Sequence, residues 1–212
     1  DYLGSRLLGS EWTGNLEVAH VIWNIRFPRM VAALLVGGVL SVAGAAYQSL
    51  FRNPLVSPDV LGASSGAGFG AALAIVLGLG PTGLQGVAFL FGLLAVLGAR
   101  SVSWMTCRDQ VLTLVLGGII VSALFSAGVS ILKYLADPDR ELPAITFWLM
   151  GGLNGVRHAD LPALFTPILT CTIVLWLLRW QLDAVTFGEE TAKSLGANVT
   201  WLRAGVIVCA TI

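Results

Sequence analysis

Ionisable side chains are scarce in this chain of 212 residues: 11% are charged, against roughly 25% in a typical soluble domain. The 12 basic and 12 acidic residues balance, so the chain lacks the basic excess that nucleic-acid binding requires. Apolar residues make up 56% of the sequence, and the mean hydropathy is +0.84. This composition excludes a water-soluble enzyme, a disordered tail and a nucleic-acid binder, and it predicts a membrane protein.

Charge is absent altogether from five segments, which predict membrane-spanning helices. About 20 apolar residues cross a bilayer core of about 30 Å. The uncharged segment 60–99 is about twice that length, and its Gly/Pro-rich sequence 77–83 predicts a turn between two helices. We therefore predict an all-α, polytopic bundle with spans at about 30–51, 60–78, 82–100, 110–133 and 161–179, and the start of another span at 204–212.

The two ends of the sequence also lack expected features. The chain begins on Asp1 without an initiator methionine or signal peptide, and the last apolar segment has only nine residues. We expect one transmembrane domain, residues 1–212, that is incomplete at both ends. Lysine and arginine divide six to six between alternate sides, so the positive-inside rule gives no orientation.

Cysteine and histidine occur without the spacing of a metal or redox site. Cys107, Cys171 and Cys209 are far apart and form no CxxC motif. His20 and His158 lie in polar connections, and we interpret them as surface histidines. The uncharged segments lack histidine too, whereas proton- or ion-coupled carriers usually place ionisable residues in their spans. We predict that this chain binds no metal or cofactor and that any transport uses another energy source.

Small residues recur at helical spacing in two of the predicted spans. Gly62, Gly66 and Gly70 repeat every four residues, which favours close helix packing. A second stripe allows two interpretations: helix packing with the serine hydroxyls bonded to their own backbone, or the polar lining of a translocation path. This stripe consists of Gly118, Ser122, Ser126 and Ser130.

The connections carry further motifs. Arg26-Phe-Pro-Arg29 precedes the first span, and its arginines suit either carboxylates of a partner or lipid headgroups. After that span, prolines 54 and 58 forbid a continuous helix, and Ser57 or Asp59 is a candidate N-cap for the next one. Residues 142–152 are apolar but too short to cross, which predicts an interfacial helix.

In this order, the motifs closely resemble the FecCD family of permeases, the membrane subunits of ABC importers for iron–siderophores, haem and cobalamin. The similarity runs from residues 26–29 through 37–48, 52–67 and 147–152 to 187–196, so it covers essentially the whole chain. It implies a type II ABC importer permease, of which the chain holds about five to six of roughly ten helices. The family's loop motif falls on Arg52, Asn53, Pro54, Ser57, Pro58, Asp59 and Gly62.

The resemblance implies roles for both kinds of connection. Arg26 and Arg29 would face the cell exterior and pair with acidic residues of a periplasmic or lipoprotein substrate-binding protein. Residues 187–203 would face the cytoplasm, where Glu190-Thr-Ala192 and then Gly196 match the EAA-x3-G pattern with Thr for the first Ala. Such a short amphipathic helix, ended by Gly196, would seat on an ATPase subunit. Its coupling residues would be Gly188, Glu189, Glu190, Ala192, Leu195 and Gly196, and the 118–130 stripe would line the pathway.

The sequence thus predicts a multi-pass permease of the inner membrane that is not itself an enzyme. Its expected partners are a second permease subunit, forming a homodimer or a heterodimer, two cytoplasmic subunits that bind ATP and Mg, the external binding protein and lipid, but no nucleic acid. An ATP-independent carrier or channel and a structural membrane anchor are the alternatives. An iron chelate, haem, cobalamin or an oxyanion would all fit these residues as substrate.

Overall fold

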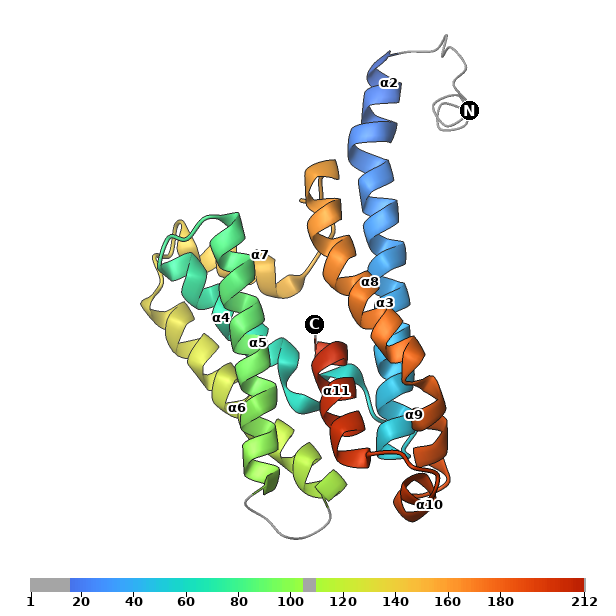
Figure 1. The fold of residues 1–212 in the computed structure, drawn as a ribbon. Helices are drawn as coiled ribbons and strands as arrows, with labels where there is room; N and C mark the ends of the chain where they lie inside the picture. Colours follow the sequence, from blue (N-terminus) through green and yellow to red (C-terminus); the bar gives the residue numbers. More distant parts are fainter. Residues whose placement is uncertain (1–15, 105–109, 212) are drawn as a thin grey trace. The chain divides into compact units, whose positions relative to one another are not determined.

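The computed structural model describes residues 16–104 and 110–211, and these residues form helices without any β-strand (Figure 1). The predicted all-α class is therefore confirmed for the described part of the chain. That part divides into two compact units, which are described separately. One contains the described residues up to Ser41 with Gly152–Thr170, and the other contains Val42–Gly151 with Cys171–Ile212.

The smaller unit begins with three helical segments that follow one another directly. Helix α2 (Leu16–Val21) continues as a π-helix, η1 (Ile22–Arg26), and then as α3 (Phe27–Phe51). The short helix η3 (His158–Asp160) leads into α8 (Leu161–Leu177), whose first ten residues complete this unit.

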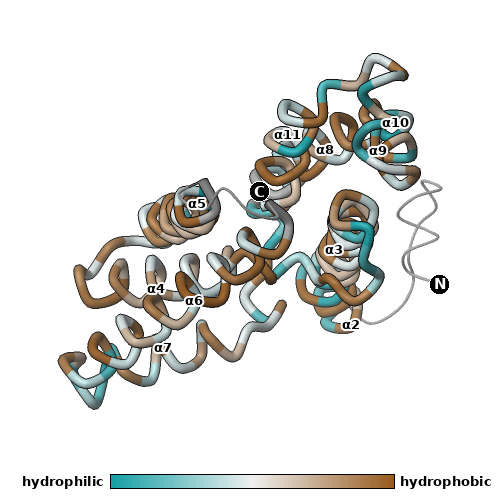
Figure 2. The backbone as a smooth tube through the Cα atoms, turned by 90° about the horizontal axis from the view of Figure 1, so that it is seen from below, coloured by the Kyte–Doolittle hydropathy of each residue, from teal (hydrophilic) through white to brown (hydrophobic). Residues whose placement is uncertain are grey.

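The larger unit contains three helices that pack closely on one another: α4 (Ala63–Val76), α5 (Pro81–Trp104) and α6 (Gln110–Leu135). Gly66 and Gly70 on α4 lie against the backbone of α5 near Phe91 and Val87, where a Cβ atom would overlap. The predicted close helix packing is thus confirmed for Gly66 and Gly70, whereas Gly62 precedes α4 and does not share its packing face. In Figure 2, which colours the backbone by hydropathy, α4 and α6 are mostly white to brown, the colours of neutral and hydrophobic residues.

Two further groups of helices belong to the larger unit. Helix α7 (Glu141–Met150) lies where the sequence predicts an interfacial helix, and the 3-10 helix η2 (Pro58–Leu61) precedes α4. The C-terminal part contains α9 (Arg179–Thr186), α10 (Glu189–Ser194) and α11 (Val199–Thr211). The region predicted as 187–203 therefore holds α10 and the first turns of α11, and the helix expected from residue 204 begins at Val199.

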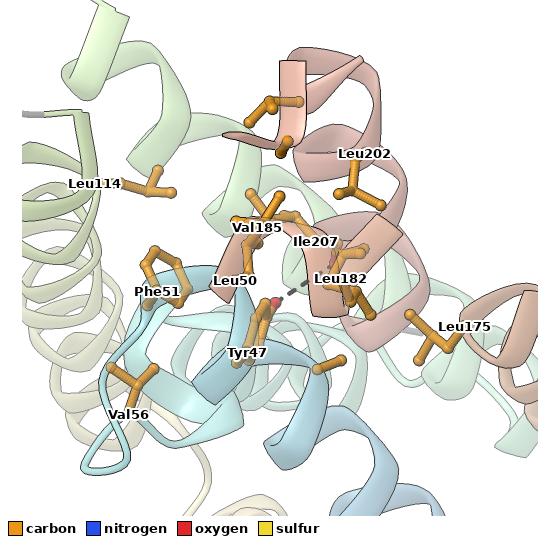
Figure 3. Close-up of a cluster of buried hydrophobic side chains, with 14 of the residues drawn as sticks. Tyr47, Leu50, Phe51, Val56, Leu114, Leu175, Leu182, Val185, Leu202 and Ile207 are labelled. Carbon is orange, nitrogen blue, oxygen red and sulfur yellow. Dashed lines mark hydrogen bonds between the residues drawn. The ribbon is translucent and has the colours of Figure 1, made fainter. Parts of the chain in front are cut away.

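A hydrophobic core joins the end of α3 to the C-terminal helices within this unit (Figure 3). Tyr47 and Leu50 of α3 pack with Leu182 and Val185 of α9 and with residues of α11. The Tyr47 hydroxyl donates a hydrogen bond to the carbonyl oxygen of Ile207 at 3.4 Å. This core gives α9, α10 and α11 a fixed support.

The described helices differ in whether they can cross a bilayer alone. Three continuous segments are long and apolar enough, 17–51, 81–102 and 112–135, and a fourth is possible if α8 and α9, bent by 52°, form one broken span. Helix α4 has only 14 residues, or about 21 Å at 1.5 Å per residue, so it falls short of the crossing predicted for 60–78. Gly62 and Gly78, both with positive φ, limit it.

Of the two predicted N-cap residues after the first span, Ser57 occupies the N-cap position of η2, in an extended conformation and without a side-chain cap hydrogen bond, and Asp59 lies inside η2. Neither residue caps α4. The residue before α4 is Gly62, with φ +79°, which also has no side-chain cap. A separate 3-10 turn thus stands between the proline-rich loop and the helix, and it moves the helix start away from both candidates.

Candidate functional site

The Arg26-Phe-Pro-Arg29 motif lies where the π-helix η1 becomes α3. In η1 the Phe27 N–H donates to the carbonyl of Ile22, five residues back. The next bond of this register would run from residue 28 to the carbonyl of Trp23, but Pro28 has no N–H. The proline of the motif therefore removes the donor that would otherwise continue this bonding pattern.

His158 supplies a donor to that carbonyl from a distant part of the sequence. Its Nε2 lies 2.7 Å from the Trp23 oxygen, and because a carbonyl only accepts, Nε2 carries the hydrogen. The imidazole also packs on the rings of Trp23 and Phe27, with centroids 5.3 and 5.9 Å away. His158 is therefore half-buried and bonded within the smaller unit, which the prediction of a surface histidine did not include, whereas His20 is exposed and bonds Asn24 at 2.9 Å.

The two arginines of the motif have different environments. Arg26 is exposed, whereas Arg29 is partly buried. The Arg29 Nη2 donates to the carbonyl oxygen of Asn154 at 2.8 Å, and its Nε is buried without an acceptor in the described residues. Arg29 and His158 thus each tie residues 22–29 to residues 154–158, and Arg26 is presented outward from this assembly.

The family loop motif shapes the connection between α3 and α4. Arg52 has φ +50°, and the Asn53 side chain accepts a hydrogen bond from the Leu55 N–H at 2.9 Å, so the chain turns at the end of α3. Pro54, Ser57 and Asp59 are exposed and Pro58 is half-buried, whereas Gly62 is buried. A Cβ at Gly62 would lie 2.7 Å from Ser122 Oγ, so the end of the loop packs on α6.

The 118–130 stripe on α6 is divided between two environments. Gly118 is buried against η2, where a Cβ would overlap the Val60 carbonyl, and Ser122 faces Gly62. Ser126 and Ser130 are exposed, and the Ser130 hydroxyl donates to the Ser126 carbonyl at 3.0 Å. Two members of the stripe therefore serve packing within the unit, and the other two remain available to line a path.

Helix α10 lies between two glycines with positive φ, Gly188 at +121° and Gly196 at +84°. At its end the Gly196 N–H donates to the Lys193 carbonyl and the Ala197 N–H to the Ala192 carbonyl, at 3.0 and 2.9 Å. This pair of bonds is the Schellman arrangement, in which Gly196 is the C′ residue. The predicted helix end is thus confirmed.

One face of α10 is buried and the other is open. Ala192 is fully buried in the core, whereas Glu190 and Lys193 are exposed and Leu195 is 53% exposed. Beside the helix end lies a shallow hollow of about 310 Å³, lined by Lys193, Gly196, Ala197, Asn198, Val199 and Thr200. The exposed face of such a short amphipathic helix, together with the adjacent hollow, can bind a partner protein.

Glu189, at the start of α10, forms an ion pair with Arg203 of α11. Arg203 is the buried charged residue of the described core, with 8% of its surface exposed. The sequence analysis missed Arg203 because it selected residues within the motif, and Arg203 lies seven positions beyond Gly196. The available signal was a lone arginine in an otherwise apolar helix.

The described residues contain no group of three or more His, Cys, Asp or Glu side chains that could hold a metal ion. Cys171 and Cys209, 38 positions apart in the sequence, are nevertheless in side-chain contact, and both are free thiols. The sequence spacing gave no sign of this contact. Cys107 lies outside the described residues.

The sequence is similar to a known family and to several transport proteins. Residues 6–212 match the model of the FecCD transport family. The chain is 40% identical over 184 residues to the molybdate import system permease protein MolB of Haemophilus influenzae, covering 87% of this chain and 55% of that protein. It is 36% identical over 208 residues to a Helicobacter pylori permease assigned to iron chelatin transport, covering 98% and 62%.

The hemin transport system permease protein HmuU of Yersinia pestis is 33% identical over 201 residues, covering 91% of this chain and 59% of that protein. The chain thus spans between half and two thirds of the length of these relatives. A solved structure, described as an inward-facing conformation of a transporter assigned to the metal-chelate ABC type, is 36% identical with a TM-score of 0.85 and covers 99% of this chain and 72% of its own. The chain belongs to the FecCD transport family.

Proposed function

We propose that this chain is the membrane-spanning permease part of an ATP-driven ABC importer in the inner membrane. Its relatives are transport permeases for hemin, iron chelatin and molybdate, and the described helices include three that are long and apolar enough to span a bilayer. The permease itself catalyses no reaction. Two cytoplasmic subunits bind and hydrolyse Mg-ATP, and a second permease subunit completes the pathway.

The observation that carries this proposal is the geometry of α10. Its inner face is fixed in the core at Ala192, its end is defined by Gly196, and its outer face presents Glu190, Lys193 and Leu195. A short helix built in this way transmits force to the helices behind it because it cannot sink into the core. We assign its exposed face to contact with the ATPase subunit on the cytoplasmic side.

The Arg26–Arg29 region is assigned to docking of an external binding protein. Arg26 is exposed, and its guanidinium suits a carboxylate partner. The hydrogen bond from Arg29 to Asn154 and the one from His158 to Trp23 hold the surface in one shape. A rigid surface loses less conformational entropy when the partner binds.

The substrate proposed is a metal chelate of the iron–siderophore, haem or cobalamin type. Ser126 and Ser130, which are exposed on α6, are the residues of the 118–130 stripe retained as path-lining candidates. A second substrate class, the molybdate oxyanion, is favoured by the 40% identity to MolB.

The test is to measure ATP hydrolysis by the complete complex while the binding protein is loaded with each candidate in turn. An iron chelate, haem, cobalamin and molybdate form the panel, and unloaded binding protein is the control. The proposal expects stimulation by one of the chelates. Stimulation by molybdate alone would select the second substrate class, and hydrolysis that responds to none of the loaded forms would contradict the assignment as an importer of this kind.

A further inference from the structure

Glu189 and Arg203 join two helices that are also connected through the turn of residues 195–198. Glu189 is the first residue of α10, and Arg203 lies in the second turn of α11. Their side chains are 37% and 10% exposed, so the pair is largely removed from water on the arginine side. A carboxylate at the start of a helix is also favoured by the helix dipole. The position of Glu189 therefore suits both its own helix and the arginine.

The covalent connections of α10 do not by themselves fix its direction. Gly188 precedes it and Gly196 follows it, both with positive φ, and a Cβ at Gly196 would meet open space. The helix is six residues long, or about 9 Å, and it has one fully buried side chain, Ala192. The methyl group of Ala192 does not fix the rotation of the helix, because it packs equally well in several orientations. The charged hydrogen bond between Glu189 and Arg203 does constrain that rotation, because it requires a defined geometry.

The ion pair therefore completes a rigid connection. The end of α10 reaches α11 through residues 195–198, and its start reaches α11 through the Glu189 carboxylate and the Arg203 guanidinium. The start of α10 also packs on α9, and the ion pair adds a direct link from that start to α11, so that α11 is connected to both ends of α10. Arg203 is buried, and Val199, Leu202 and Val206 of the same helix belong to the core, so a pull on the Arg203 guanidinium acts on a helix that is anchored in the core.

We propose that Glu189 and Arg203 are the positioning residues through which displacement of α10 is passed into α11. This inference rests on the proposed function, in which α10 contacts the ATPase. The proposal gives different roles to the two adjacent glutamates of the motif. Glu189 points to α11, whereas Glu190, which is exposed, faces the ATPase subunit. The connection acts after the ATPase has bound, so its loss separates ATP hydrolysis from transport without releasing the ATPase.

The experiment compares E189Q with D183N in the complete permease, reconstituted with its ATPase subunits and binding protein. Both changes remove one negative charge and keep the size of the side chain, and Asp183 is an exposed residue of α9 outside the assigned contact. We expect E189Q to bind the ATPase normally but to lower the amount of substrate transported per ATP by at least about fivefold, the lower end of typical coupling between sites. D183N should leave that ratio within about twofold of the wild-type value.

A charge exchange separates positioning from folding. E189Q removes the Glu189 carboxylate from Arg203 and can lower expression, so the double variant E189R/R203E is measured beside R203E alone. The proposal expects the exchange to recover part of the transport per ATP that R203E loses. Recovery of folded protein without recovery of that ratio would overturn the proposal, because the pair would then be structural only. Wild-type coupling in folded E189Q would overturn it as well.

The substitution L195E distinguishes failure of this inference from failure of the proposed function. Leu195 is on the exposed side of α10, and a charge there should prevent copurification with the ATPase. If L195E still binds the ATPase and transports normally, the contact assigned to α10 is wrong and both proposals fall. If L195E releases the ATPase while E189Q couples normally, only the inference about Glu189 and Arg203 falls.

Discussion

Replacing Gly118 by alanine is expected to destabilise the permease because backbone atoms of η2 occupy the space that the methyl group needs. The new Cβ would overlap the Val60 carbonyl oxygen and lie 2.9 Å from Leu61 Cα. Neither atom can rotate away, so α6 and η2 must separate. Overpacking of this kind costs about 1–3 kcal/mol, which lowers the ratio of folded to unfolded protein by about 5- to 160-fold.

The matched control is Gly86→Ala in α5, where the added methyl group meets nothing within 4 Å. Both variants gain the same helix propensity, about 1 kcal/mol, so their difference isolates the overlap. Thermal unfolding in detergent, followed by tryptophan fluorescence, should show Gly118→Ala about 2–12 °C below Gly86→Ala. Equal midpoints would refute the contact between α6 and η2 and would return Gly118 to the path-lining candidates.

Three further predictions concern the candidate sites. Arg26→Glu should weaken binding of the external binding protein without changing thermal stability. Arg29→Ala should lower both the affinity for the binding protein and the thermal stability. A binding titration measures the affinity, and thermal unfolding measures the stability. His158→Ala should lose about 0.5–1.5 kcal/mol from the hydrogen bond to Trp23 and speed amide hydrogen exchange in residues 22–26; unchanged exchange there would contradict the bond. Gly196→Leu places a side chain at φ +84°, and it should reduce transport per ATP; a normal ratio would count against the role of the helix end.

Hydrophobic segments and the glycine and proline residues that interrupt them were sufficient to predict most of the helices. Charge-free segments longer than 20 residues correspond to α3 and α6 because lipid excludes charge over the whole crossing. The Gly/Pro sequence after residue 76 separates α4 from α5 as predicted. Composition could not predict the shortness of α4, because the apolar residues 60 and 61 belong to the separate helix η2, and the backbone turns at Gly62 before α4 begins.

Local motifs predicted the positions of functional residues better than their partners. The Gly196 helix end follows from the sequence because a C′ glycine acts through its own backbone. The partners of Arg29 and of the Trp23 carbonyl could not be predicted, since Asn154 and His158 are more than 120 positions away. The spacing of the 118–130 stripe showed that its members share a face of α6, but only η2 decides which of them are covered.

Arg203 shows why sequence reasoning missed one of the two charges of the ion pair. The motif drew attention to Glu190, which matches the EAA pattern, whereas the side chain that reaches α11 is that of Glu189. Which of the two glutamates faces α11 depends on the rotation of about 100° between adjacent residues of a helix. That rotation is fixed by the burial of Ala192, which tertiary packing determines.

The most direct test of the central claim is substrate uptake into proteoliposomes that contain the complete permease and its ATPase subunits. The loaded binding protein is supplied on one side and ATP on the other. The account predicts uptake that requires Mg-ATP on the α10 side and the binding protein on the Arg26 side, and that stops when hydrolysis is blocked. Uptake at an equal rate by the permease alone, without ATP or the ATPase, would contradict the account and identify an ATP-independent carrier or channel.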